Sequence, residues 1–149
     1  MLEIKVLGYP RIYRDGELIE NFLSNKVVAL LCYLAMNPQI HARDRLAGLL
    51  WSDMPDTKAK SNLRQALHDL NRLVGDYVEI TRQTAQIKNE CCYQVDALQL
   101  QKIVTSDAPT DLNQLQALAE MYRGDFLEGI NLSLDGEFDD WLLTRREHL

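Results

Sequence analysis

Along residues 58–72 the chain carries a row of cationic, amide and hydroxyl side chains at helical spacing. The row comprises Lys58, Lys60, Ser61, Arg64, Gln65, His68 and Arg72. Arginine can donate paired hydrogen bonds to guanine and glutamine can pair with adenine, while lysine and serine reach phosphate oxygens. On one side of a helix, side chains of these types favour contacts with the grooves and phosphates of duplex DNA.

The other side of the same segment is apolar. On a wheel of about 100° per residue, its apolar residues gather around one direction: Ala59, Leu63, Ala66, Leu67, Leu70 and Val74. We therefore expect an amphipathic helix over Thr57–Val74, with Asp56 or Thr57 as its cap and Gly75 as its stop. The apolar stripe of this helix would be buried and the polar side would face outward.

Charge is distributed unevenly along the chain. The net charge is -6, yet residues 1–93 hold 12 Lys and Arg against 11 Asp and Glu, whereas residues 94–149 hold 4 against 11. Between Lys58 and Arg72 the only acid is Asp69, so this helix is basic. Only the first part of the chain has the charge to face DNA, although solvent-exposed helices also commonly carry charged outer faces.

The segments before this helix predict a small sheet and a buried helix. Residues 2–6 alternate apolar and polar side chains, and the turn at Asp15-Gly16 separates two further extended runs, which indicates an antiparallel sheet. A helix that Ser24 can cap then keeps its apolar spacing until Asn37-Pro38. We expect this first helix to lie mostly in the core.

Two further elements flank the basic helix. A short helix covers ARDRLAGLLW, residues 42–51, and a turn joins it to the basic helix. Afterwards, residues 77–82 and 86–88 are rich in β-formers and would pair as a hairpin with its tip near Gln83. A sheet, three helices and a hairpin form the plan of a winged helix-turn-helix. In that plan the hairpin, or wing, brings a cation such as Arg82 to a neighbouring phosphate or the minor groove.

Several segments carry a resemblance to a known family. LEIKVLGYPRIYRDGELI, RDRLAGLLW and KSNLRQALHDLNRLVG closely resemble the N-terminal domain of the antibiotic-regulatory (SARP) transcription factors, an OmpR-type winged helix with an extra N-terminal sheet. VDALQLQKI and YRGDFLEGINLSLDGEFDDWLLTRREHL resemble the opening of the bacterial transcriptional activator domain that follows it in that family. The resemblance covers the whole chain.

The resemblance implies an α+β winged-helix domain at residues 1–93 and the α-helical, TPR-like start of a truncated activator domain at residues 94–149. It implies a regulator that binds promoter-proximal direct repeats, often as head-to-tail protomers, and recruits RNA polymerase. By position, Arg82 would lie at the wing. The resemblance also places five residues on the DNA-facing side of the third helix: Ser61, Arg64, Gln65, His68 and Arg72.

The sequence departs from the family at three positions. Ala42 stands where a capping serine is usual, at a cost of about 1 kcal/mol in helix stability. Asp69 and Asn71 stand where arginine is common, which makes this helix less basic than is typical. These departures leave open an alternative function, a protein-interaction or oligomerisation module whose winged helix has little affinity for DNA.

The sequence predicts neither catalysis nor a bound metal or cofactor. The three cysteines, Cys32, Cys91 and Cys92, form no CxxC pair, and the three histidines lie in separate segments without ligand spacing. No phosphate-binding glycine motif or activated nucleophile is present. No apolar run approaches the roughly 20 residues needed to cross a bilayer, and the start has no signal-peptide core. We expect a cytoplasmic protein that is not an enzyme.

Overall fold

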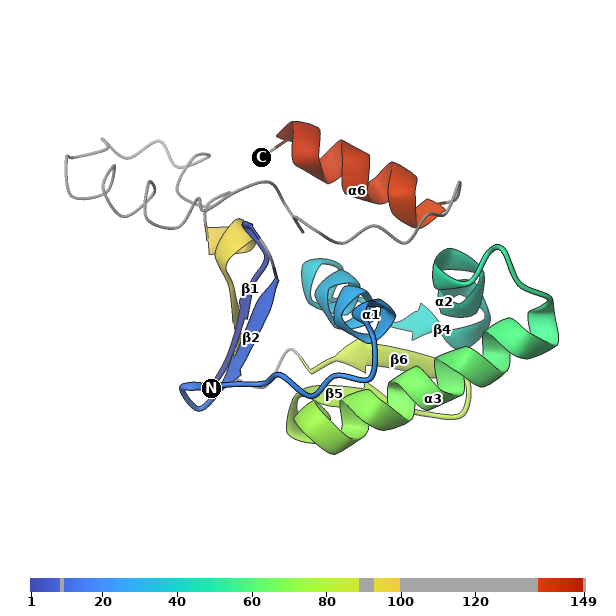
Figure 1. The fold of residues 1–149 in the computed structure, drawn as a ribbon, viewed down its shortest axis with the longest axis horizontal. Coiled ribbons are helices and arrows are strands. Elements are labelled where there is room, and N and C mark those ends of the chain that lie inside the picture. Colours follow the sequence, from blue (N-terminus) through green and yellow to red (C-terminus); the bar gives the residue numbers. More distant parts are fainter. Residues whose placement is uncertain (9, 89–92, 100–136, 149) are drawn as a thin grey trace.

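The computed structural model describes residues 1–8, 10–88, 93–99 and 137–148 (Figure 1). The described residues form a mixed α+β fold, with an N-terminal four-stranded sheet, three helices, a small antiparallel three-stranded sheet and a further helix near the C-terminus. The helices predicted between residues 100 and 136, with the motif YRGDFLEG, lie outside the described residues. None of the helices in the described part is long and apolar enough to cross a membrane.

The N-terminal sheet begins with three short antiparallel strands. β1 (Leu2–Lys5) pairs with β2 (Arg11–Arg14), which in turn pairs with β3 (Glu17–Leu18). Asp15 and Gly16 make the turn between β2 and β3, with φ of 52° and 84°. Two-residue hairpin turns require such left-handed angles, which glycine adopts without a Cβ clash. The predicted N-terminal hairpin is therefore confirmed.

A fourth strand makes this sheet mixed, so the prediction of a purely antiparallel sheet is wrong. β7 (Tyr93–Val95) pairs in parallel with β1. After it, the Asp96 carboxylate accepts hydrogen bonds from the backbone N–H groups of Val6 (2.8 Å) and Leu7 (3.2 Å). Parallel neighbours need a long crossover connection, here the intervening helices and second sheet, and such a connection leaves no local turn signal in the sequence. The expected domain boundary near residue 93 falls within this strand.

α1 (Asn25–Met36) is the buried helix that its apolar spacing predicted. Every residue from Ala29 to Met36 is buried. Ser24 occupies the N-cap position, but its side chain makes no capping hydrogen bond. At the other end, the backbone N–H and the side-chain amide of Asn37 both donate to the Tyr33 carbonyl at 3.0 Å. Burial, more than N-terminal capping, therefore stabilises α1.

α2 (Arg43–Leu50) and the second sheet form close to where the sequence predicted. β4 (His41–Ala42) leads directly into α2 and pairs with β6 (Thr84–Ile87), which also pairs with β5 (Val78–Ile80). Both pairings are antiparallel, and β5 and β6 are the predicted hairpin. Ala42 is the N-cap residue of α2, and no side chain caps this helix.

α3 (Asp56–Val74) begins one residue before the predicted start. Its N-cap residue is Pro55, so the prediction that Asp56 or Thr57 caps it is wrong. The Pro55 carbonyl accepts the Ala59 N–H at 2.9 Å, which makes Pro55 the last residue outside the helix. Asp56 lies in the first turn, where its negative charge favours the positive end of the helix dipole.

α3 ends at Val74 with Gly75 as its C-cap residue, so the predicted end of the helix is confirmed. Gly75 has φ of -56°, a right-handed value, and begins the 3-10 turn η1 (Gly75–Tyr77). No left-handed glycine stops the helix. A Cβ at Gly75 would lie 3.0 Å from Oδ1 of Asn71, so glycine allows the close approach of this side chain.

α6 (Glu137–His148) packs on the side of α1 that faces away from α3 (Figure 1). The Trp141 ring meets Tyr33 of α1 edge-on, with 4.9 Å between ring centroids. Leu142, the next residue, is buried and belongs to the same hydrophobic core as α1, α2 and α3. The C-terminal helix therefore closes the core on the face opposite the basic helix.

Candidate nucleic-acid interface

α3 buries one side and exposes the other, as its helical periodicity predicted. The six residues of the apolar stripe are at most 4% exposed: Ala59, Leu63, Ala66, Leu67, Leu70 and Val74. The seven polar residues singled out by sequence are all exposed: Lys58, Lys60, Ser61, Arg64, Gln65, His68 and Arg72. We call these seven residues the polar face of α3. The fold thus presents the predicted residues together, along one helix.

The turn between α2 and α3 fixes where the polar face begins. Trp51 closes α2, because its N–H donates to the Ala47 carbonyl at 2.9 Å and its ring is buried. The Met54 N–H donates to the Trp51 carbonyl at 3.1 Å, and the Met54 sulfur accepts the side-chain amide of Asn62 at 3.1 Å. The turn is therefore tied to both helices, which holds α3 at a defined angle to α2.

The cations of the polar face differ in their partners. Lys60 Nζ lies 3.6 Å from Oδ1 of Asp44 on α2, and both side chains are exposed. An exposed pair of this kind contributes little, because water screens the charges. Within the part of the chain that the structure describes, Lys58 and Arg64 form no ion pair. Their charge is available to an external anion.

Arg72 differs from the rest of the polar face because it has a close internal partner. Its guanidinium donates to Oδ1 of Asp69 at 2.6 Å and to the Asn21 carbonyl at 3.4 Å. The other oxygen of Asp69 accepts the Leu23 N–H at 2.9 Å. Asp69 is only 6% exposed, so it is not a solvated acid among the cations. Helical periodicity could not show this, because the loop at residues 20–24 covers that side of α3.

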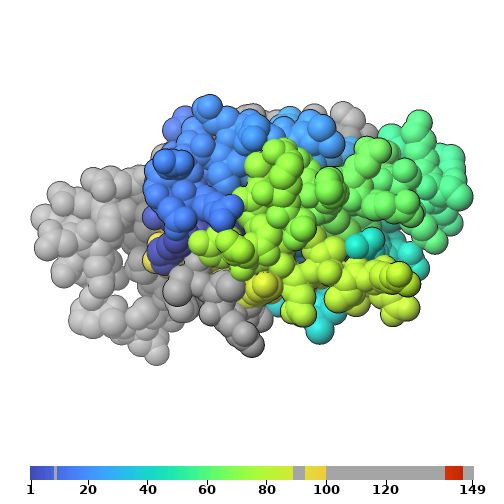
Figure 2. Space-filling view, turned by 90° about the horizontal axis from the view of Figure 1, so that it is seen from below, coloured from blue at the N-terminus to red at the C-terminus, as the bar shows by residue number. Residues whose placement is uncertain are grey.

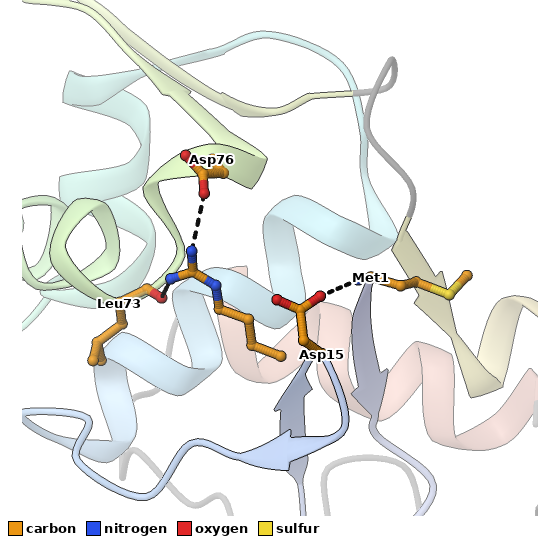
Figure 3. Close-up of polar contacts among 5 residues, drawn as sticks. Met1, Asp15, Leu73 and Asp76 are labelled. Atoms are coloured by element: carbon orange, nitrogen blue, oxygen red, sulfur yellow. Dashed lines mark hydrogen bonds and ion pairs between the residues drawn. The ribbon is translucent and has the colours of Figure 1, made fainter.

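The N-terminal sheet holds the C-terminal end of α3. Arg14 of β2 donates to the Leu73 carbonyl and to the Asp76 carboxylate, both at 2.9 Å (Figure 3). A cation at the last carbonyls of a helix is favoured by the helix dipole. Beside it, the Met1 amino group donates to Asp15 at 2.6 Å, and this hydrogen bond lowers the pKa of the exposed Asp15 carboxyl.

Threonine side chains order the tip of the β5–β6 hairpin. Thr81 Oγ1 accepts the N–H groups of Gln83 at 3.3 Å and Thr84 at 3.0 Å. The Gln83 carbonyl accepts the Arg43 N–H, at the start of α2, at 2.9 Å. Arg82 is exposed at this tip. The cation that the sequence assigned to the wing is therefore carried by a turn that is fixed to α2.

The sequence-based set of site residues did not include the arginines at the start of α2. The backbone N–H of Arg43 donates to the Gln83 carbonyl at the hairpin tip. Arg45, two residues later, is exposed. The motif RDR carries both residues. Its closeness to the hairpin depends on the pairing of β4 with β6, which has no local signal in the sequence.

The polar face and the hairpin belong to one side of the molecule. Figure 2 shows α3 crossing this face, with the β5–β6 hairpin along one flank and the N-terminal segment along the other. In Figure 2 α3 lies between the hairpin and the loop that leads into α1, and hydrogen bonds of Asn21 and Leu23 join this loop to α3. A long rod-shaped anion laid on this face would meet α3 and the hairpin together.

Other surfaces in the described part of the chain offer less defined chemistry. A groove of about 480 Å³ lies between β2, β3 and the start of α1, and polar and apolar surface contribute about equally to its lining. The described residues contain no group of three His, Cys, Asp or Glu placed to hold a metal ion. Burial raises the pKa of the Cys32 thiol far above its usual range, so this cysteine is a poor nucleophile.

Comparison with known proteins adds no family assignment. No protein-family model matches the chain, and no curated protein is significantly similar to it. The function must therefore be inferred from the residues of the candidate interface and from the resemblance that the sequence carries.

Proposed function

We propose that the protein is a sequence-specific DNA-binding regulator of transcription, built on a winged helix-turn-helix. In this proposal α3 enters the major groove, α2 braces it from behind and the β5–β6 hairpin is the wing. One observation carries the proposal. The polar face of α3 is exposed over its length, and its cations Lys58 and Arg64 have no acidic partner among the described residues.

The residue types on the polar face suit the two kinds of contact that DNA offers. Arg64 and Gln65 can form bidentate hydrogen bonds with the edges of guanine and adenine. Lys58, Lys60 and Ser61 can donate to phosphate oxygens, which sets the register of the helix on the duplex. Together these contacts would give the protein both affinity and sequence preference.

The length of α3 limits how much of it can meet base edges. Its 19 residues span about 28 Å at roughly 1.5 Å per residue, whereas the major groove is about 12 Å wide. Two or three turns fit against the bases, so residues 58–68, ending at His68, form the reading segment. Arg82 on the wing would contact a flanking phosphate or the minor groove.

The family resemblance supports a role in transcription control. On that basis residues 94–149 begin a helical, TPR-like activator domain, and protomers bind direct repeats head-to-tail in the bacterial cytoplasm. RNA polymerase would be the protein partner. α6 lies on the side of α1 opposite α3 (Figure 1). A protein partner could therefore reach α6 while α3 is bound to DNA.

A protein-interaction module with little DNA affinity is the second candidate. The chain has a net charge of -6, which opposes binding to a polyanion. Two cations of the polar face, Lys60 and Arg72, already lie beside acids of the same chain. In this candidate function the exposed side of α3 is solvated surface, and its positive charges have no specific ligand.

The salt dependence of binding separates the two candidates. We would enrich duplexes from a random library with the wild-type chain, and titrate a labelled duplex at several salt concentrations. The variants are Arg64→Ala and, as a charge-matched control on α6, Arg145→Ala. If α3 binds DNA, log K falls against log salt by about 0.9 per phosphate contact. Arg64→Ala then weakens binding about tenfold, and the control binds like wild type.

Two results would contradict DNA binding as the function. The first is a library that yields no enriched duplex, and the second is equal binding by the wild type and Arg64→Ala at low salt. Either result would make the protein-interaction module the leading candidate, and a search for a protein partner would follow.

A further inference from the structure

We propose that Arg72 positions α3 for DNA instead of contacting DNA, and that it does so through its ion pair with the buried Asp69. The inference rests on the proposed function. It gives Arg72 a different role from the other residues of the polar face, with which helical periodicity and the family resemblance both group it. Four residues form the device, which we call the clasp: Asn21, Leu23, Asp69 and Arg72.

The clasp uses both oxygens of one buried carboxylate. Oδ1 of Asp69 accepts the Arg72 guanidinium at 2.6 Å, and Oδ2 accepts the Leu23 N–H at 2.9 Å. Arg72 also reaches the Asn21 carbonyl at 3.4 Å. Hydrogen bonds with a charged partner are stronger than neutral ones. The Asp69 carboxylate is buried, while the Arg72 side chain is half exposed. The clasp therefore ties the last third of α3 to the loop that leads into α1.

A second attachment restrains the same end of α3. Arg14 of β2 binds the Leu73 carbonyl and the Asp76 carboxylate at 2.9 Å (Figure 3). The clasp holds α3 from the loop and Arg14 holds it from the sheet, so both the rotation and the axial position of the helix are fixed. Side chains extend about 5–6 Å from a helix axis, so a rotation of about 10° moves their tips by about 1 Å. A shift of that size is enough to spoil hydrogen bonds with base edges.

A phosphate at Arg72 would compete with Asp69 for the same guanidinium, whose Nη2 makes both hydrogen bonds of the clasp. If the phosphate drew Arg72 away, the buried carboxylate would lack its only cationic partner among the described residues. An uncompensated buried charge is strongly unfavourable. Arg72 also lies more than one turn beyond His68, the end of the proposed reading segment. The loop at residues 20–24 is hydrogen-bonded to this part of α3, so we expect the helix to approach DNA with its earlier turns.

The experiment compares affinity, salt slope and specificity in clasp variants of the full chain. The variants are Arg72→Ala, Arg72→Lys, Asp69→Asn and the double variant Arg72→Ala/Asp69→Asn, with Lys58→Ala as the reference for a direct phosphate contact. The probes are the duplex enriched by the wild type and poly(dI-dC) as non-specific DNA. Circular dichroism melts and an active-fraction titration establish that each variant is folded at the assay temperature.

A positioning role predicts a specific pattern. Arg72→Ala and Asp69→Asn each weaken binding to the enriched duplex about tenfold, while the salt slope stays at the wild-type value. The double variant binds no more weakly than the single variants, because both remove the same link. Arg72→Lys recovers most of the affinity, and binding to poly(dI-dC) is unchanged. Lys58→Ala, in contrast, lowers the slope by about 0.9, because the proposed function assigns Lys58 to a phosphate.

Different results would overturn the inference. A slope that falls by about 0.9 in Arg72→Ala, together with undiminished binding by Asp69→Asn, would make Arg72 a direct phosphate contact. Wild-type affinity in both single variants would leave the clasp without a role in DNA binding. In either case the wild type still binds its duplex, so the proposed function stands. A wild type that enriches no duplex overturns the proposed function, and this inference with it.

Discussion

Asp69 is an acid within a basic helix, yet it adds almost no exposed negative charge to that helix. By sequence it counts against DNA binding, since it lowers the charge of the helix. In the structure its carboxylate accepts hydrogen bonds from the Arg72 guanidinium and the Leu23 N–H. Leu23 lies 46 positions earlier in the chain, so no local pattern could predict this contact. Helical periodicity predicted which residues of α3 are exposed, but it could not predict that Asp69 binds Arg72 and the Leu23 N–H.

Removing the Asp69 carboxylate should destabilise the protein. Asp69→Ala deletes charge-assisted hydrogen bonds and leaves the Leu23 N–H without its acceptor, so we expect the free energy of unfolding to fall by about 2–3 kcal/mol. Urea denaturation monitored by circular dichroism measures this free energy of unfolding. The control is Asp44→Ala, which breaks the exposed pair with Lys60 and should cost less than about 1 kcal/mol. Equal losses in the two variants would show that Asp69 is not buried in solution.

Among the elements, those with a strong local period were predictable and those made by distant pairing were not. α1, α2 and α3 form where apolar spacing indicated, and the β5–β6 hairpin follows from its β-formers. β7 was missed because its parallel partner, β1, lies far from it in the sequence, near the N-terminus. Pro55 was not recognised as the N-cap of α3 because Asp56 and Thr57 are the commoner capping types.

Two glycine substitutions should change stability in opposite directions. Gly16 has φ of 84° in the β2–β3 turn, so Gly16→Ala should cost about 1–2 kcal/mol of backbone strain. Gly48 lies inside α2, and a Cβ there meets no atom within 4 Å. Gly48→Ala should therefore stabilise the protein by about 0.5–1 kcal/mol through helix propensity. Thermal and urea melts would measure both, and a loss of stability in Gly48→Ala would contradict the placement of that residue.

Across the whole molecule, α3 and α6 lie on opposite sides of α1 (Figure 1). The sequence predicted a helix near the C-terminus but not what it packs against, because Tyr33 and Trp141 are brought together only by the tertiary fold. This arrangement separates the two candidate surfaces of the protein. DNA would occupy the side with α3 and the hairpin, and a protein partner would have access to the side with α6.

Two adjacent leucines test whether α6 is docked in this way. Leu142 is 4% exposed, whereas Leu143 is 56% exposed. Leu142→Ala should lower the free energy of unfolding by about 2–4 kcal/mol through lost burial, and Leu143→Ala should change it by less than about 0.5 kcal/mol. Equal effects in denaturant melts would mean that α6 does not pack on α1 as described.

The measurement that tests the central claim most directly is amide NMR of the isotope-labelled chain during titration with its enriched duplex. The proposed function predicts that the largest shift changes fall at residues 58–68 of α3 and at residues 81–84 of the hairpin tip, while the amides of α6 stay unchanged. Changes concentrated on α6, with residues 58–68 unaffected at saturation, would contradict the proposal that α3 binds DNA.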